Sequence, residues 1–211
     1  TSTYYCEVTC NASAITTAST PVTITLLPFN ACYCTPSAVN GPFANSGKIM
    51  LVDFEGIRNK TFASPGPSPY YYIIPPGLGT SAQVIKGNTY PLTISLSGQT
   101  NAGVWIDWDH SGVFEDNEFV LNGTYTSNTG TLDISQNITV PATALTGATK
   151  MRVRANTSLY EPVITAIDAC ATYTYGETEE YEINVIQATL CNGQPSPGNV
   201  ISNVNTACVG D

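Results

Sequence analysis

Residues 104–118 read VWIDWDHSGVFEDNE, a segment in which oxygen-bearing side chains recur at alternate positions. When Asp107 is counted as position 1, further candidate ligands fall at positions 3, 5, 7, 9 and 12, and a glycine, Gly112, falls at position 6. Twelve-residue calcium loops take their oxygen ligands at these positions, with a backbone carbonyl at position 7 and a bidentate glutamate at position 12. The spacing predicts a calcium site with six ligand residues: Asp107, Asp109, Ser111, Val113, Glu115 and Glu118.

The residues on both sides of this loop favour strands. Residues 104–106 before it and residues 119–121 after it are mostly β-branched or aromatic, and such residues are enriched in strands. A true EF-hand has a helix on each side of its loop. We therefore expect an EF-hand-like calcium loop inside an all-β domain.

The rest of the chain also consists of short strand patterns separated by Gly, Pro and Asn. Apolar residues alternate with polar ones, and no segment shows helical periodicity. Regularly spaced short strands of this kind predict an antiparallel two-sheet β-sandwich. The strands expected in this domain are residues 49–54, 70–74, 90–96, 103–106, 118–121, 131–134, 138–140, 150–155 and 180–186.

We expect three parts along the chain, of which residues 28–187 form the calcium-binding β-sandwich. Residues 1–27 contain two strand patterns, and the Tyr-x-Cys pattern at Tyr4 and Cys6 is typical of a closing strand of an immunoglobulin-like domain. Residues 188–211 are rich in Pro and Gly and resemble the opening strands of a following immunoglobulin-like domain. The sequence therefore predicts a piece of a modular array.

The composition indicates a soluble extracellular protein. Only 11% of the 211 residues are charged, the net charge is −9, and no apolar run approaches the roughly 18 residues of a membrane helix. No secretory signal peptide is recognisable, so we expect that it was removed or that the chain is internal to a longer one. The seven basic residues are scattered, which argues against nucleic acid as a partner because phosphate binding needs clustered Lys and Arg.

Seven cysteines and a single histidine indicate disulfides in an oxidising compartment rather than a zinc site. The odd number means that at least one cysteine has no partner within the chain. Cysteines near the two ends are assigned to the neighbouring domains: Cys6, Cys10, Cys191 and Cys208. Cys32, Cys34 and Cys170 then remain for the central domain, and we predict a Cys34–Cys170 disulfide.

Glu177, Glu179 and Glu180 belong to a second acidic cluster. In a strand, Glu177 and Glu179 point to one side of the sheet and Glu180 points to the other. One interpretation is an acidic strand that pairs with Arg152 or Arg154. In the other interpretation, Glu177 and Glu179 complete the calcium site or form a second one, because a cation relieves the repulsion between crowded carboxylates.

Two motifs in the same order resemble the GEVED domain of secreted Bacteroidetes-type proteins. Family members carry a Trp-Ile-Asp-Trp-Asn-x-Asp-Gly-x-Phe loop and, further on, a Gly-Glu-Val-Glu-Asp-Tyr motif. Here residues 105–114 read WIDWDHSGVF and residues 176–181 read GETEEY. An opening YCTP at residues 33–36 and MRVR at residues 151–154 also fit, so the resemblance spans residues 33–186.

The resemblance implies a location and an architecture but no reaction. Such domains occur in large surface proteins exported by type IX secretion, beside immunoglobulin-like repeats, both as accessories of enzymes and in adhesin-like chains. Thr178 and Glu180 replace the family's usual Val and Asp, and Ser111 stands where Asp is common. Because a serine hydroxyl is neutral, we expect Ser111 to be the weakest of the calcium ligands.

We expect no catalytic residues. His110, the only histidine, lies at a non-ligand position of the loop, which does not suit a Ser-His-Asp triad. A glycosidase needs one protonated carboxyl group, whereas metal ligands are ionised, and no phosphate-loop, dinucleotide or zinc-protease motif is present. The sequence therefore predicts a non-catalytic, calcium-stabilised structural or adhesive module of an extracellular bacterial surface protein such as an adhesin, stalk or filament.

The alternative is a carbohydrate-binding accessory module of a secreted enzyme. Strand alternation places Trp105 opposite the core-facing Val104 and Ile106, so Trp105 is expected to be partly exposed. Several aromatic residues could then stack on sugars: Tyr70, Tyr71, Tyr72, Trp105, Trp108, Tyr173 and Tyr175. The expected partners are neighbouring modules of the same long chain, other copies that complete the flanking strands, or a glycan, without membrane insertion.

Overall fold

The computed structural model describes residues 2–24, 32–44, 46–60 and 70–188, which form strands and two short 3-10 helices but no α-helix. None of the helices in these ranges is long and apolar enough to cross a membrane. The 3-10 helices are η2 (Asp116–Glu118) and η3 (Ala166–Cys170). The strands are β1 (Ser2–Tyr4), β2 (Glu7–Thr9), β3 (Thr16–Ala18), β4 (Val22–Ile24), β5 (Ser37–Asn40), β6 (Lys48–Phe54), β7 (Ile57–Lys60), β8 (Tyr71–Ile73), β9 (Ser81–Ile85), β10 (Thr89–Ser97), β11 (Thr100–Ile106), β12 (Phe119–Tyr125), β13 (Thr131–Thr139), β14 (Gly147–Thr157) and β15 (Thr172–Ile186).

The N-terminal strands form a narrow antiparallel ladder. β1 pairs with β4, and β2 pairs with β3. Every residue from 2 to 24 is exposed. The two predicted strand patterns are therefore present as one interrupted hairpin, and its assignment to an immunoglobulin-like domain stays a prediction. The predicted following domain was residues 188–211, and all of it except residue 188 lies outside the described residues.

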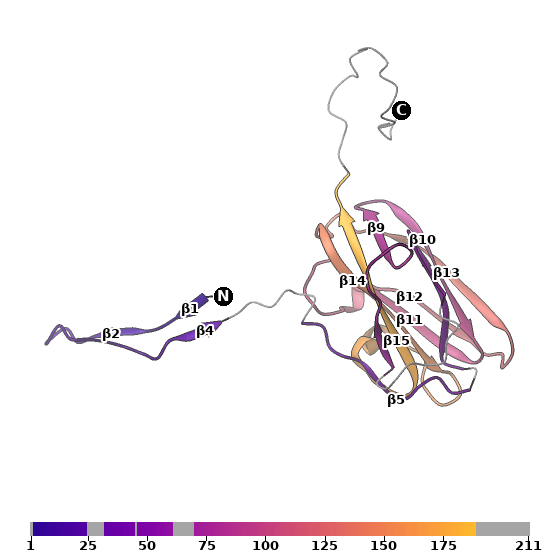
Figure 1. Cartoon of the computed structure of the whole chain (residues 1–211), viewed down its shortest axis with the longest axis horizontal. Coiled ribbons are helices and arrows are strands. Elements are labelled where there is room, and N and C mark those ends of the chain that lie inside the picture. The colour runs from indigo at the N-terminus through magenta and orange to yellow at the C-terminus, as the bar shows by residue number, and fades with distance from the viewer. Residues whose placement is uncertain (1, 25–31, 45, 61–69, 189–211) are drawn as a thin grey trace, which may run out of the picture.

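The largest sheet is built around β15, a strand of 15 residues. Its antiparallel part has the order β12-β11-β14-β15. On the other edge of β15, the short strands β5, β8 and β9 follow one another, and all three run parallel to it. Figure 1 shows β5 and β9 near opposite ends of this long strand.

The expectation of a wholly antiparallel fold is wrong at this edge. Neighbouring strands joined by a tight hairpin must be antiparallel, whereas strands that arrive through long connections can be parallel. β5, β8 and β9 come from segments far from β15 in the sequence, so no hairpin determines their direction. β5 and β9 were also not among the expected strands, and they are only four and five residues long.

A second, four-stranded sheet has the antiparallel order β13-β10-β6-β7. The two strand patterns expected at residues 131–134 and 138–140 form the single strand β13, which pairs with β10 along its whole length, from Thr131 opposite Ser97 to Thr139 opposite Thr89. The two large sheets contribute residues to one hydrophobic cluster. Its members include Val52, Phe54, Leu92, Ile94, Leu96, Val104, Ile106, Met151, Val153, Tyr181 and Ile183.

The opposite face of the larger sheet is also covered. Trp105 is fully buried there, together with Phe114, Ile164 and Tyr173, and its Nε1 donates to the carbonyl of Ala166 at 2.9 Å. The prediction of a partly exposed Trp105 is therefore wrong. Strand alternation correctly placed Trp105 on the face opposite Val104 and Ile106, but the connection between β14 and β15 covers the face on which Trp105 lies.

Candidate metal site

The predicted calcium loop begins where β11 ends. Asp107 is fully buried directly after this strand. Its backbone N–H donates to the carbonyl of Lys150 at 3.1 Å, and the Thr149 hydroxyl donates to the Asp107 carbonyl. Both partners belong to β14, so the sheet itself holds the first residue of the loop.

Backbone amides in the following turn hold the acidic side chains. The Ser111 N–H lies 3.2 Å from Asp107 Oδ1 and 3.0 Å from Asp109 Oδ1, and the Gly112 N–H donates to Asp107 Oδ2 at 3.1 Å. His110 and Gly112 have φ angles of 57° and 78°. A glycine adopts this left-handed conformation without steric cost, so Gly112 allows the chain to turn around the carboxylates.

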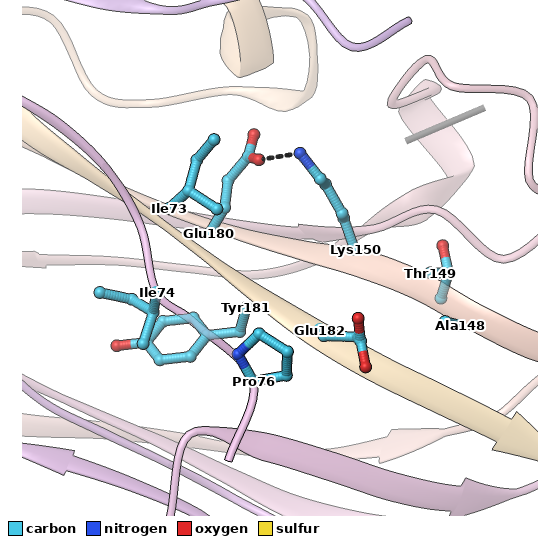
Figure 2. A pocket seen from close by; sticks show the side chains of 9 residues that line it. All are labelled: Ile73, Ile74, Pro76, Ala148, Thr149, Lys150, Glu180, Tyr181 and Glu182. Carbon is cyan, nitrogen blue, oxygen red and sulfur yellow. Dashed lines mark hydrogen bonds and ion pairs between the residues drawn. The ribbon is translucent and has the colours of Figure 1, made fainter. Parts of the chain in front are cut away.

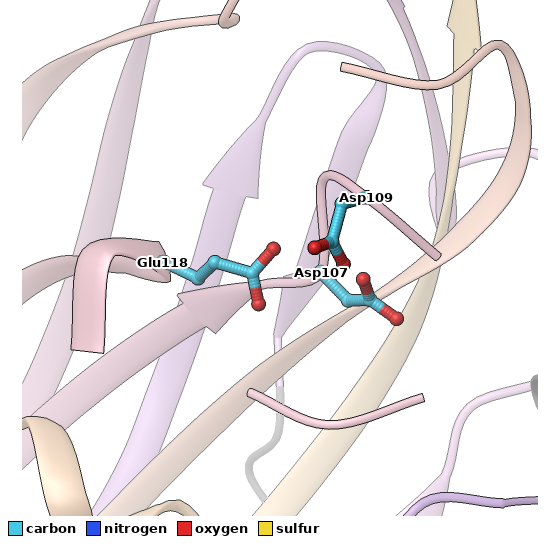
Figure 3. Close-up of side chains that lie close together, drawn as sticks. All are labelled: Asp107, Asp109 and Glu118. Carbon is cyan, nitrogen blue, oxygen red and sulfur yellow. The ribbon is translucent and has the colours of Figure 1, made fainter. Parts of the chain in front are cut away.

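Asp107, Asp109 and Glu118 each place a carboxylate oxygen within 4.8 Å of the others, and no other such acid, histidine or cysteine group occurs in the described part of the chain. Figure 3 shows the three side chains converging. Glu118 reaches this position from η2, where its Oε1 accepts the Trp108 N–H at 2.5 Å and its Oε2 accepts the Glu115 N–H at 3.3 Å.

The other predicted ligands join the same network through Ser111. The Ser111 hydroxyl donates to the Val113 carbonyl at 3.1 Å and lies 2.9 Å from Glu115 Oε1. Ser111, Val113 and Glu115 are thus connected to one another by hydrogen bonds, and the Ser111 N–H connects them to Asp107 and Asp109, but only Asp107, Asp109 and Glu118 converge as a group. His110 lies in the same loop and is half-buried.

The charges in this loop favour a bound cation. Burial and the neighbouring Glu115 carboxylate raise the pKa of Glu118 to about 8. Burial also raises the pKa of Asp107 above its ordinary value. Crowded, buried carboxylates resist ionisation unless a positive charge is close. Oxygen ligands of this kind suit a hard divalent cation, and the charge of such a cation would favour the ionised form of the carboxyl groups.

Glu177 and Glu179 are not brought to the loop. Both are buried, and on β15 they lie on the same face as Tyr181, which faces the core. Asp107 lies on the same face as Trp105, on the opposite side of the sheet. The Ile49 N–H donates to Glu177 Oε1 at 2.6 Å. Tyr181 Oη donates to Glu179 Oε2 at the same distance.

Glu180 points to the other side of β15, as alternation predicted. It forms a buried ion pair with Arg152 and a partly buried one with Lys150, the latter at 2.5 Å. The interpretation of this cluster as an acidic strand paired with Arg152 is therefore confirmed for Glu180. Arg154 instead donates to the Thr178 hydroxyl at 3.1 Å.

The Lys150–Glu180 ion pair also borders a cavity of about 130 Å³ between β8 and strands β14 and β15 (Figure 2). None of the loop acids lines it. The lining residues are Ile73, Ile74, Pro76, Ala148, Thr149, Lys150, Glu180, Tyr181 and Glu182.

Sequence reasoning missed Tyr33. Its hydroxyl donates to Asp107 Oδ2, although the two residues are 74 positions apart. Tyr33 precedes Cys34, and the predicted Cys34–Cys170 disulfide is present. The YCTP motif was the one available signal for this contact, and it carried no information about which residue Tyr33 would meet.

Fold and site together define an all-β protein whose sheets support an oxygen-rich acidic loop, of which Asp107 and Glu118 are buried. Residues 101–184 match the family model of the GEVED domain, so this part of the chain is a GEVED domain. The match includes both the acidic loop and the Gly176–Tyr181 motif. A search of curated proteins finds no match to the chain.

Proposed function

We propose that residues 28–187 form a non-catalytic, calcium-stabilised β-sandwich that serves as a structural or adhesive module of a large extracellular bacterial surface protein. The convergence of Asp107, Asp109 and Glu118 on one point carries this proposal. The shared hydrophobic core of the two large sheets supports the sandwich architecture.

Calcium suits this loop better than softer metals. The three converging groups are carboxylates, and the candidate ligand of Val113 is its carbonyl oxygen. Calcium takes six to eight such oxygens in flexible geometry, whereas magnesium requires a near-ideal octahedron and keeps several waters. A twelve-residue loop with six candidate ligands provides the flexible arrangement.

Residues of the loop would bind the ion and thereby stabilise the fold. The backbone N–H and carbonyl of Asp107 are hydrogen-bonded to residues of β14, and Glu118 directly precedes β12. An ion shared by these two residues would link two strands of the larger sheet. Binding to the folded form alone stabilises it by about 2.7 kcal/mol when free calcium is 100 times Kd.

Three features support a location outside the cell in a tandem chain. The Cys34–Cys170 disulfide fits an oxidising compartment. The low charge content and the GEVED domain agree with a surface protein whose partners are neighbouring modules of the same chain. The glycan alternative is less well supported, because three of its expected stacking residues are buried: Trp105, Trp108 and Tyr173.

Calcium-titrated thermal unfolding tests the proposal. The wild-type Tm should rise with calcium, whereas the Tm of Asp107→Ala and of Glu118→Ala should not. Asp116→Ala is the matched control, because Asp116 lies in the same loop but is exposed and outside the ligand spacing. A wild-type Tm that is insensitive to calcium, or an Asp107→Ala variant that responds like wild type, would contradict the calcium role.

Screening on a glycan array tests the structural role itself. A module that serves in a stalk or filament should bind no sugar specifically, with calcium present. A specific, saturable sugar signal would instead favour the carbohydrate-binding function.

A further inference from the structure

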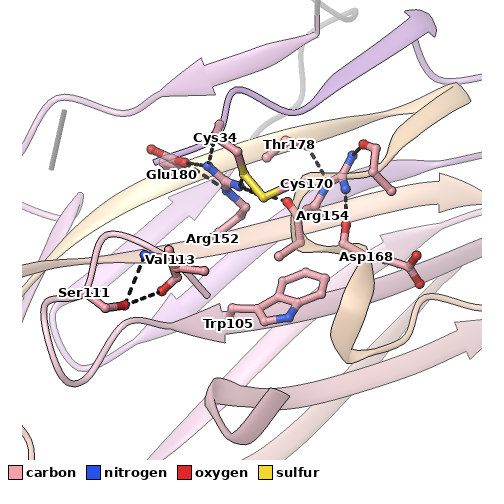
Figure 4. The surroundings of a disulfide bond; sticks show 12 residues. Cys34, Trp105, Ser111, Val113, Arg152, Arg154, Asp168, Cys170, Thr178 and Glu180 are labelled. Carbon is pink, nitrogen blue, oxygen red and sulfur yellow. Dashed lines mark hydrogen bonds and ion pairs between the residues drawn. A yellow bond between two sulfur atoms is a disulfide. The ribbon is translucent and has the colours of Figure 1, made fainter. Parts of the chain in front are cut away.

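A covalently anchored segment lies beside the acidic loop. The Cys34–Cys170 disulfide joins residues that are 136 positions apart and ties Cys34 to the end of η3. Figure 4 shows this disulfide next to the side chain of Arg152. Tyr33 directly precedes Cys34, so the disulfide fixes the backbone from which the Tyr33 ring extends.

Arg152 strengthens the anchor. This fully buried side chain donates through Nη2 to the Cys34 carbonyl at 2.7 Å and through Nη1 to the Ala169 carbonyl at 2.8 Å. Its guanidinium also lies 4.6 Å from the ring centroid of Phe114, which belongs to the acidic loop. One arginine therefore contacts the disulfide segment, η3 and the loop at the same time.

Tyr33 makes the direct contact with the loop. Its ring stacks on Phe114 with centroids 5.0 Å apart, and its hydroxyl donates to Asp107 Oδ2. The phenol hydroxyl is a neutral donor, so it can orient a carboxylate without adding charge to the site.

The hydrogen bonds distinguish the two oxygens of Asp107. Oδ2 accepts both the Tyr33 hydroxyl and the Gly112 N–H. Oδ1 accepts the Ser111 N–H at 3.2 Å. Because a carboxylate oxygen has about two lone-pair sites, Oδ2 is saturated, whereas Oδ1 retains a site for a cation.

We propose that Tyr33 is a positioning residue that directs Asp107 Oδ1 toward the cation, and that the Cys34–Cys170 disulfide holds Tyr33 in place. This inference rests on the calcium site proposed above. Partners that orient a ligand side chain commonly change metal affinity by about 10- to 100-fold. The disulfide thereby increases the calcium affinity of a loop that is distant from Cys34 and Cys170 in sequence.

The test compares calcium Kd values, measured by isothermal titration calorimetry, for wild type and Tyr33→Phe. This substitution removes only the hydroxyl and keeps the ring on Phe114. We expect the calcium Kd to rise about 10- to 100-fold. Tyr160→Phe is the control, because Tyr160 is exposed, and it should bind calcium like wild type.

The double variant Cys34→Ser/Cys170→Ser tests the anchor. Its calcium affinity should fall in the same direction as that of Tyr33→Phe, and adding Tyr33→Phe to it should cause little further loss. If the double variant does not fold, the calcium Kd of wild type with and without a thiol reductant tests the anchor instead, and an unchanged Kd would overturn the anchoring role.

The outcomes separate the two proposals. If wild type binds no calcium, the proposed function itself fails. If wild type binds calcium, Asp107→Ala does not, and Tyr33→Phe keeps the wild-type Kd, only the positioning role is overturned. A lower Tm of Tyr33→Phe in EDTA with an unchanged Kd would likewise show that Tyr33 acts on stability alone.

Discussion

Glu177 combines burial with proximity to a second carboxylate, and these two causes raise its pKa to about 8. Its Oε1 accepts the Ile49 N–H from the facing sheet, so this residue of the GEVED motif connects the two large sheets. The bond is compatible with a protonated carboxyl group, which needs no counter-ion. The first glutamate of the motif is therefore a buried link between sheets and not a ligand of the acidic loop.

The raised pKa of Glu177 predicts a stability that falls as pH rises. In the unfolded chain the carboxyl ionises near 4.5, whereas in the folded chain it stays protonated up to about pH 8. Between these values the folded state binds the additional proton, so the free energy of unfolding decreases with pH, by up to about 1.4 kcal/mol per pH unit.

Urea unfolding in EDTA at pH 5 and pH 8 measures this effect. Wild type should lose more stability than Glu177→Gln between the two values, since glutamine does not titrate. The comparison cancels contributions from the acidic loop, which both proteins share. Equal losses in the two proteins would refute the assignment to Glu177.

At the scale of elements, the pairing of β14 with β15 depends on Gly176. A Cβ atom at this position would lie 2.3 Å from the carbonyl oxygen of Ala155 and 3.2 Å from the Cα of Asn156. Both atoms belong to the backbone of β14, so neither can move without distorting the sheet. The glycine of the motif thus allows two central strands to approach closely.

Gly176→Ala should destabilise the fold by about 1–3 kcal/mol, the usual cost of overpacking. Gly77→Ala is a suitable control, because a Cβ atom there would meet the side-chain hydroxyl of Thr80 at 3.3 Å and no backbone atom within 4 Å. Denaturant unfolding of both variants provides the measurement. A Gly176→Ala protein as stable as the Gly77→Ala protein would show that the strands separate without cost.

At the scale of the whole molecule, the buried residues belong to the sheets and to the connections that cover them. One cluster lies between the two large sheets, and a second, around Trp105, lies on the other face of the larger sheet. The ladder of β1 to β4 contributes to neither, since all of its residues are exposed. Because two-stranded ladders have little independent stability, this segment is expected to contribute little to the stability of the rest.

Removal of residues 1–27 should therefore leave the main unfolding transition unchanged. Differential scanning calorimetry of the shortened and the whole chain, both with calcium, is the measurement. The two Tm values should agree within about 2 °C, because the described residues of this segment, 2–24, are all exposed. A clear decrease in Tm would indicate that the ladder packs on the sheets.

Much of the site could be predicted because it is local. The ligand spacing from Asp107 to Glu118 lies within twelve residues, and the turn at Gly112 brings those side chains together. Strand alternation likewise predicted most strands and the opposite orientations of Glu179 and Glu180. These properties depend on the backbone period and on side-chain chemistry, both of which the sequence determines by itself.

Other features were decided by contacts between distant segments. The burial of Trp105 depends on a later connection that covers its face, and the parallel strands along β15 depend on the paths of long connections. Tyr33 contacts Asp107 across 74 positions of sequence, from a segment that the disulfide and Arg152 connect to the region around η3. Local pattern indicates which way a side chain points, but only the tertiary structure determines what covers it and which distant residue it contacts.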